Sequence, residues 1–127
     1  MRVHWGPVLA GVVAGFVIGS VIGLIISGFV PDGSGQQVLL VLLSFLIELG
    51  AGFVAGRFSP DSQALNGSQS ALLLYLIASV IALTNGANLI VLIIGAALAL
   101  VIGTMGGILA IAVGSPPPTA DRPPSPD

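Results

Sequence analysis

The sequence has no cysteine and no lysine, and only 6% of its 127 residues are charged. Without cysteine, the chain has no disulfides, no thiolate metal ligands and no cysteine nucleophile. Soluble domains typically carry roughly 25% charged residues. Three arginines, five acidic residues and one histidine offer too little ionic surface to keep this chain dispersed in water. A soluble monomer is therefore excluded, and a nucleic-acid partner, which needs clustered basic residues, has no support.

Residues that carry chemistry are equally scarce. The single histidine, His4, lies beside Trp5, a pairing typical of the interfacial belt of a membrane protein. One histidine cannot form a metal site without other ligands. The sequence shows no Ser-His-Asp set, no phosphate-binding loop and no pair of carboxylates. We therefore expect no enzymatic activity, no cofactor and no metal, and the sequence identifies no small-molecule substrate.

Apolar residues dominate what remains, at 55% of the chain, and the mean hydropathy is +1.11. A helix needs about 20 largely apolar residues to cross about 30 Å of hydrocarbon. The third candidate segment is the least apolar, so its polar first turns are expected to find partners inside a helix bundle. The sequence predicts an all-α, polytopic membrane protein with one transmembrane domain, residues 1–113, and four spans at about 8–30, 38–58, 64–84 and 87–113.

The ends of the spans indicate an orientation. Arg2, Arg57 and Arg122 all fall on one side of a four-span layout, and the positive-inside rule makes that side the cytoplasm. Both termini are then cytoplasmic. Residues 114–127 are rich in proline and lack large apolar side chains, which predicts a disordered tail. The absence of lysine beside abundant Ala, Gly, Val and Pro is typical of a GC-rich prokaryotic genome, which places the protein in the plasma membrane.

Small residues recur at every fourth position in three of the predicted spans. In lipid, such stripes allow two helices to approach closely enough for van der Waals contact and hydrogen bonding. One interpretation is packing within a four-helix bundle, and the other is a pore wall or an interface between copies. We predict helix-packing roles for Gly11, Gly15, Gly19 and Gly23 in the first span, Gly52 and Gly56 in the second, and Gly95, Gly103 and Gly107 in the fourth.

Glu48 is the one residue that predicts intramembrane chemistry. It lies about ten residues into the second span, roughly 15 Å deep and so near the midplane. An acidic residue there costs about 2.5–3.5 kcal/mol on insertion, so it should be neutral and face the bundle interior. With Ser44 and Tyr75 it forms a candidate polar site. Glu48 is either a hydrogen-bonded residue that fixes helix register or a relay for a proton or cation.

Arg57 ends the second span and Trp5 precedes the first, and both are interpreted as interfacial anchors. The second span ends with Gly52-Phe53-Val54-Ala55-Gly56-Arg57, and the third opens with Asn66-Gly67. From Trp5 through the fourth span, the chain resembles small four-span prokaryotic membrane proteins of unknown function. Those proteins carry a Gly-x-x-Ala-Gly-Arg signature followed by an Asn-Gly or His-Gly pair. The resemblance implies a fold and no activity.

From these observations we expect a small integral membrane protein that acts as a structural or accessory subunit without catalytic activity. Its partners would be the lipid bilayer and a larger membrane complex or further copies of itself. The alternative is a small oligomeric transporter or channel that uses Glu48 as an intramembrane proton or cation site.

Overall fold

The computed structural model describes residues 1–114, and the described chain is all-helical. Its four helices are α1 (Trp5–Phe29), α2 (Ser34–Phe58), α3 (Gln63–Thr84) and α4 (Leu89–Ala112). Each helix is long and apolar enough to cross a membrane, which confirms the predicted all-helical class and the four membrane-length segments. The predicted disordered tail lies outside the described residues, apart from Gly114 at its start.

Prolines set the ends of the first two helices. Val30 precedes Pro31 and Ser59 precedes Pro60, and both Val30 and Ser59 have extended backbone angles. A residue before proline avoids the helical region because it clashes with the proline ring. Helix α2 begins at Ser34, one turn earlier than the predicted span, so its first turn is polar.

A glycine and an asparagine shape the turn between α3 and α4. Gly86 has a φ of 83°, a left-handed conformation that glycine adopts without the strain a Cβ would bring. The side chain of Asn88 then accepts a hydrogen bond of 2.9 Å from the backbone N–H of Ile90. This bond caps the first turn of α4, where backbone N–H groups lack helical partners.

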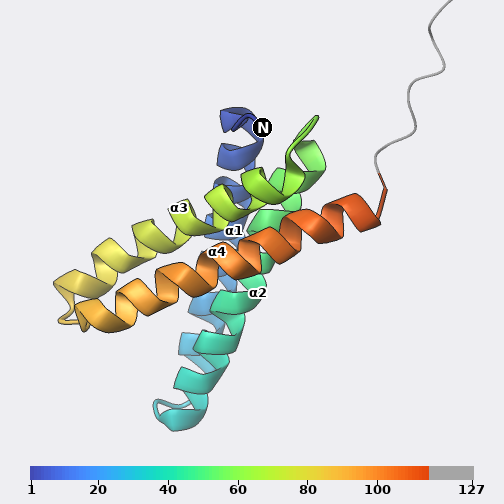
Figure 1. Cartoon of the computed structure of the whole chain (residues 1–127). Coiled ribbons are helices and arrows are strands. Elements are labelled where there is room, and N and C mark those ends of the chain that lie inside the picture. Colours follow the sequence, from blue (N-terminus) through green and yellow to red (C-terminus); the bar gives the residue numbers. More distant parts are fainter. Residues whose placement is uncertain (115–127) are drawn as a thin grey trace, which may run out of the picture.

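The four helices form two antiparallel hairpins, α1 with α2 and α3 with α4, that cross each other (Figure 1). Helix α2 contacts each of the other three helices, whereas α1 and α4 do not contact each other within the described chain. The loop between α2 and α3 joins the hairpins at one end. Beyond the crossing, the two hairpins diverge towards their separate tips (Figure 1).

The residues buried at the crossing are mostly small. No aromatic side chain is among the buried hydrophobic residues of the described chain, and the largest fully buried one is Val8. Large apolar side chains instead cover the outside, where they would face lipid in a membrane. The buried hydrophobic residues are Val8, Val12, Ala51, Ala55, Ala71, Leu74, Ala99 and Ala110.

Candidate functional site

Helices α2 and α4 approach each other backbone to backbone. A Cβ built on Gly52 would lie 2.5 Å from the carbonyl oxygen of Gly103 and 2.9 Å from its Cα. A Cβ on Gly56 would lie 2.9 Å from the Cα of Gly107. Because Gly52 faces Gly103 and Gly56 faces Gly107, the same register places Glu48 level with Ala99, one turn earlier on each helix.

Helix α3 enters the same contact through Gly67. A Cβ on Gly67 would lie 2.6 Å from the carbonyl oxygen of Gly103 and 2.9 Å from that of Gly52. Since α3 runs antiparallel to α2, one further turn places Ala71 at the level of Glu48. Ala71 and Ala99 are both fully buried. Glu48 therefore lies at the level where α2, α3 and α4 converge.

The Glu48 side chain is buried at this junction, with 5% of the residue exposed. Its Oε2 atom has no hydrogen-bond partner in the part of the chain that the structure describes. Ser44, predicted to share its site, is exposed and donates to the carbonyl of Val41 at 2.7 Å. Tyr75 is half-buried, and its hydroxyl lies against Gly95 on α4. The structure does not join Glu48, Ser44 and Tyr75 through hydrogen bonds.

Other hydroxyl groups in the membrane-length helices also donate to their own backbone. Ser79 Oγ donates to the carbonyl of Tyr75 at 2.8 Å, and Thr104 Oγ1 donates to the carbonyl of Leu100 at 2.7 Å. Ser and Thr make such bonds readily within a helix. These hydroxyls therefore have their donors satisfied within their own helices.

The small residues of α1 contact both α2 and α3, but only over part of the predicted stripe. An added Cβ on Gly11 would collide with the hydroxyl of Ser70, and one on Gly19 would lie 2.8 Å from Ile47 Cδ1. At Gly23 an added Cβ would meet nothing within 4 Å. The contact of the predicted stripe therefore ends before Gly23. Beyond the crossing, α1 also lies apart from α3 (Figure 1).

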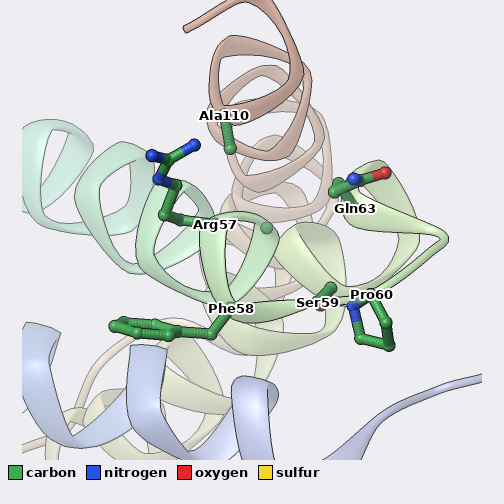
Figure 2. Close-up of a pocket in the computed structure, with 7 residues that line it drawn as sticks. Arg57, Phe58, Ser59, Pro60, Gln63 and Ala110 are labelled. Atoms are coloured by element: carbon green, nitrogen blue, oxygen red, sulfur yellow. The ribbon is translucent and has the colours of Figure 1, made fainter. Parts of the chain in front are cut away.

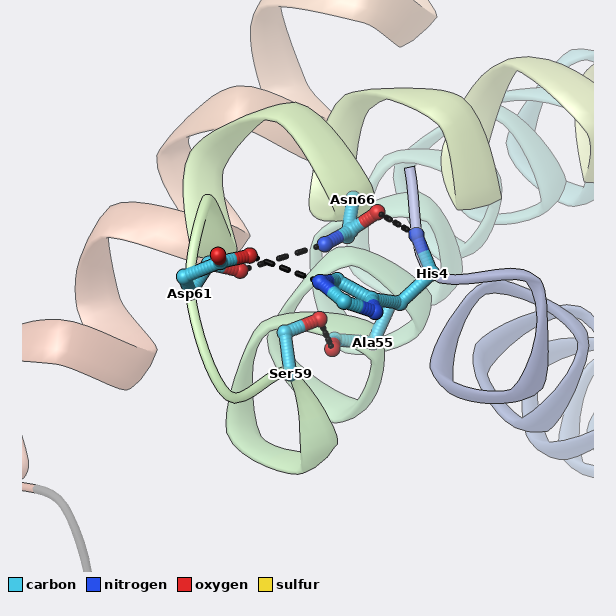
Figure 3. A network of polar contacts seen from close by, with 5 residues as sticks. All are labelled: His4, Ala55, Ser59, Asp61 and Asn66. Atoms are coloured by element: carbon cyan, nitrogen blue, oxygen red, sulfur yellow. Dashed lines mark hydrogen bonds and ion pairs between the residues drawn. The ribbon is translucent and has the colours of Figure 1, made fainter. Parts of the chain in front are cut away.

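A polar network ties the start of α1 to the other hairpin (Figure 3). The backbone N–H of His4 donates to Asn66 Oδ1 at 2.8 Å, and Asn66 Nδ2 donates to the carbonyl of Asp61 at 3.3 Å. His4 Nε2 lies 2.7 Å from Asp61 Oδ1. Asn66 is fully buried, so this network closes one end of the crossing.

Ser70 extends the connection by one helical turn. Its hydroxyl donates to the carbonyl of Val8 at 3.1 Å, and the side chain is fully buried. The sequence predicted that the polar first turns of this span find partners inside the bundle, but it did not identify the residues with which Asn66 and Ser70 pair. The available signal was their spacing, since Asn66 and Ser70 lie four residues apart and so share one face of α3.

Arg57 lies at the same end of the molecule, beside a cavity of about 390 Å³ between the ends of α2, α3 and α4 (Figure 2). Its guanidinium donates to the backbone carbonyl of Gly114, just after α4. Ser59 and Gln63 also line the cavity. Trp5, the other predicted anchor, is 60% exposed at the start of α1.

A second cavity, of about 240 Å³, is an apolar groove between the hairpins. Helix α1 contributes Phe16 and Gly19, α2 contributes Ile47, and α3 contributes Leu74 and Ile77. Glu48 lines neither this groove nor the cavity beside Arg57.

Residues 1–114 contain no cluster of three or more histidine, aspartate or glutamate side chains placed to hold a metal ion. Comparisons of the chain with protein-family models, with curated proteins and with solved structures found no match.

Proposed function

We propose that this chain is a non-catalytic integral membrane protein that serves as a structural or accessory subunit of a membrane assembly. The supporting observation is how the chain uses its buried polar groups. Asn66 and Ser70 bond α3 to α1, while Ser59, Ser68 and Ser79 each bond to a carbonyl of their own helix. These hydrogen bonds stabilise the helices and their contacts.

The groove between the hairpins supports a subunit role. It is apolar, lies partway along membrane-length helices and is lined by the exposed side chains of Phe16 and Ile77. Apolar side chains of another transmembrane helix can fill such a groove, because association in lipid depends on packing. A single apolar helix of a partner subunit is the occupant that this groove fits.

Photo-crosslinking in native membranes tests the subunit proposal. A photoreactive phenylalanine analogue at Ile77 would lie in the groove, and the same analogue at Leu109 provides a control. The two residues are matched in exposure, at 43% and 45%. We expect a discrete protein adduct from position 77 and not from position 109. Adducts to lipid alone from both positions would overturn the proposal.

The orientation with both termini in the cytoplasm, in the plasma membrane, belongs to the same proposal. The chain has no cysteine, so single cysteines can be introduced without background labelling. A cysteine at Ser34, the first residue of α2, should react with an impermeant maleimide on intact cells, and one at Ser125 should react only after lysis. Labelling of both positions from the same side would contradict this orientation.

A second candidate function is a small transporter or channel that uses Glu48. One observation favours it: Glu48 is buried at the level where three helices meet and keeps an unpartnered carboxyl oxygen. Ionisable groups inside membrane proteins often mark proton or cation pathways. Proton flux into vesicles containing the full chain should then be lost in Glu48→Gln and kept in Asp32→Asn. Flux no greater than that of empty vesicles would exclude this candidate.

A further inference from the structure

The cavity beside Arg57 lies at the depth of lipid headgroups. Helix α2 contains 25 residues, about 37 Å at 1.5 Å per residue, which is longer than the roughly 30 Å hydrocarbon core. Arg57 is in its last turn. The cavity is bounded by the end of α2, the start of α3 and the end of α4, so it opens where a spanning helix leaves the hydrocarbon.

The cavity offers donors to an anion. Figure 2 shows Arg57 and Gln63 on either side of Ala110, with the guanidinium of Arg57 directed towards the end of α4. A guanidinium has five N–H donors, and the described chain uses Arg57 Nη1 for Gly114. Asp61, the nearest acidic residue along the sequence, lies against His4 instead. Within residues 1–114, the guanidinium of Arg57 forms no ion pair.

The apolar part of the lining fits a lipid better than a free anion. Phe58 is 67% exposed and lines the cavity next to Arg57. In Figure 2 its ring points away from Arg57 towards α1. The exposed ring gives the end of α2 an apolar surface next to the cavity, against which an acyl chain can lie.

We propose that this cavity binds the phosphate headgroup of an anionic phospholipid. Arg57 provides the charge and a fork of donors suited to two phosphate oxygens, and Gln63 provides an amide donor on the other side. Phe58 contacts the start of an acyl chain. The volume of about 390 Å³ lies in the range of small-molecule sites, about 300–1,000 Å³. Basic pockets between transmembrane helices bind anionic headgroups in this way.

Native mass spectrometry of the full chain, released from nanodiscs, tests the proposal by counting retained lipids. The probes are phosphatidylglycerol, which is anionic, and phosphatidylcholine, which carries the same phosphate with no net charge. We expect wild type to retain phosphatidylglycerol preferentially and Arg57→Gln to bind it roughly 10-fold more weakly, the effect of losing one charge-assisted contact. Arg57→Lys should fall between the two.

Arg2→Gln is the matched control, because it removes the same charge from an exposed position outside the cavity. It should retain the lipid as wild type does. Equal losses in Arg2→Gln and Arg57→Gln would overturn the proposal by showing a general charge effect. sn-Glycerol 3-phosphate separates the two sources of phosphate: displacement of phosphatidylglycerol by this soluble anion at comparable concentration would overturn the lipid assignment. Circular dichroism checks that each variant is folded.

Discussion

The contact between α2 and α4 predicts that alanine substitutions at two glycines of α2 change the free energy of unfolding by different amounts. Replacing Gly52 with alanine would place a Cβ 2.5, 2.9 and 3.0 Å from the O, Cα and C atoms of Gly103. These are backbone atoms, so no flexible side chain can move aside. The helices would have to separate by about 1 Å to restore ordinary contact, which begins near 3.4 Å. Strain of this kind typically costs about 1–3 kcal/mol.

Gly50 provides the control, because an added Cβ there meets nothing within 4 Å. Both substitutions gain up to about 1 kcal/mol from the higher helix propensity of alanine. The difference between Gly50→Ala and Gly52→Ala therefore isolates the contact, and we expect Gly52→Ala to be the less stable by about 1–3 kcal/mol.

Unfolding in mixed micelles of a mild detergent and dodecyl sulfate measures this difference. A donor–acceptor dye pair on cysteines introduced at Gln36, in the first turn of α2, and at Asn85, in the turn after α3, would report separation of the hairpins. The variants should lose the folded signal at different fractions of dodecyl sulfate, with Gly52→Ala first. Coincident transitions for Gly50→Ala and Gly52→Ala would refute the backbone contact between α2 and α4.

Predictions for four further substitutions use the same measurement. Gly19→Ala should change stability by less than about 1 kcal/mol, because its Cβ would meet the flexible end of Ile47 at 2.8 Å; a loss as large as that of Gly52→Ala would contradict this. Asn66→Ala should cost about 1–3 kcal/mol, since it removes a fully buried side chain that accepts a hydrogen bond from the backbone N–H of His4. Asp61→Asn should cost under about 1 kcal/mol, because the Asp61 side chain is 63% exposed. A larger loss of stability in Asp61→Asn than in Asn66→Ala would show that the exposed pair of His4 and Asp61 contributes more than the buried amide. Glu48→Met should raise stability by about 1 kcal/mol, because it removes a buried oxygen without a partner; a lower stability would reveal a partner for Glu48.

The number and approximate limits of the helices could be predicted because they depend on local properties. Length and hydropathy identify the four apolar segments, and Pro31 and Pro60 end α1 and α2 for steric reasons. The burial of Glu48 could also be predicted, because an acidic side chain near the bilayer centre avoids lipid. These inferences need no knowledge of which helices touch.

The arrangement of the helices could not be predicted in the same way. A stripe of small residues permits close approach without choosing the partner, so nothing local distinguishes Gly19, which meets Ile47, from Gly23, which meets nothing. Ser44 lies one turn from Glu48, yet it bonds to Val41 and is exposed. The hydrogen bond from His4 to Asn66 joins residues 62 positions apart. At such a separation, sequence patterns do not indicate which residues pair.

The placement of polar residues in α3 has a consequence for how the chain enters a bilayer. Asn66, Ser68 and Ser70 all lie in the first half of the helix, next to the loop from Ser59 to Ser62. If α3 and α4 insert together as a hairpin, only the apolar half of α3 and the turn around Gly86 must be translocated. The fully buried amide of Asn66 can stay near water until the start of α1 reaches it. The polar side chains that join α3 to α1 in the folded protein thus add little to the free-energy barrier for insertion.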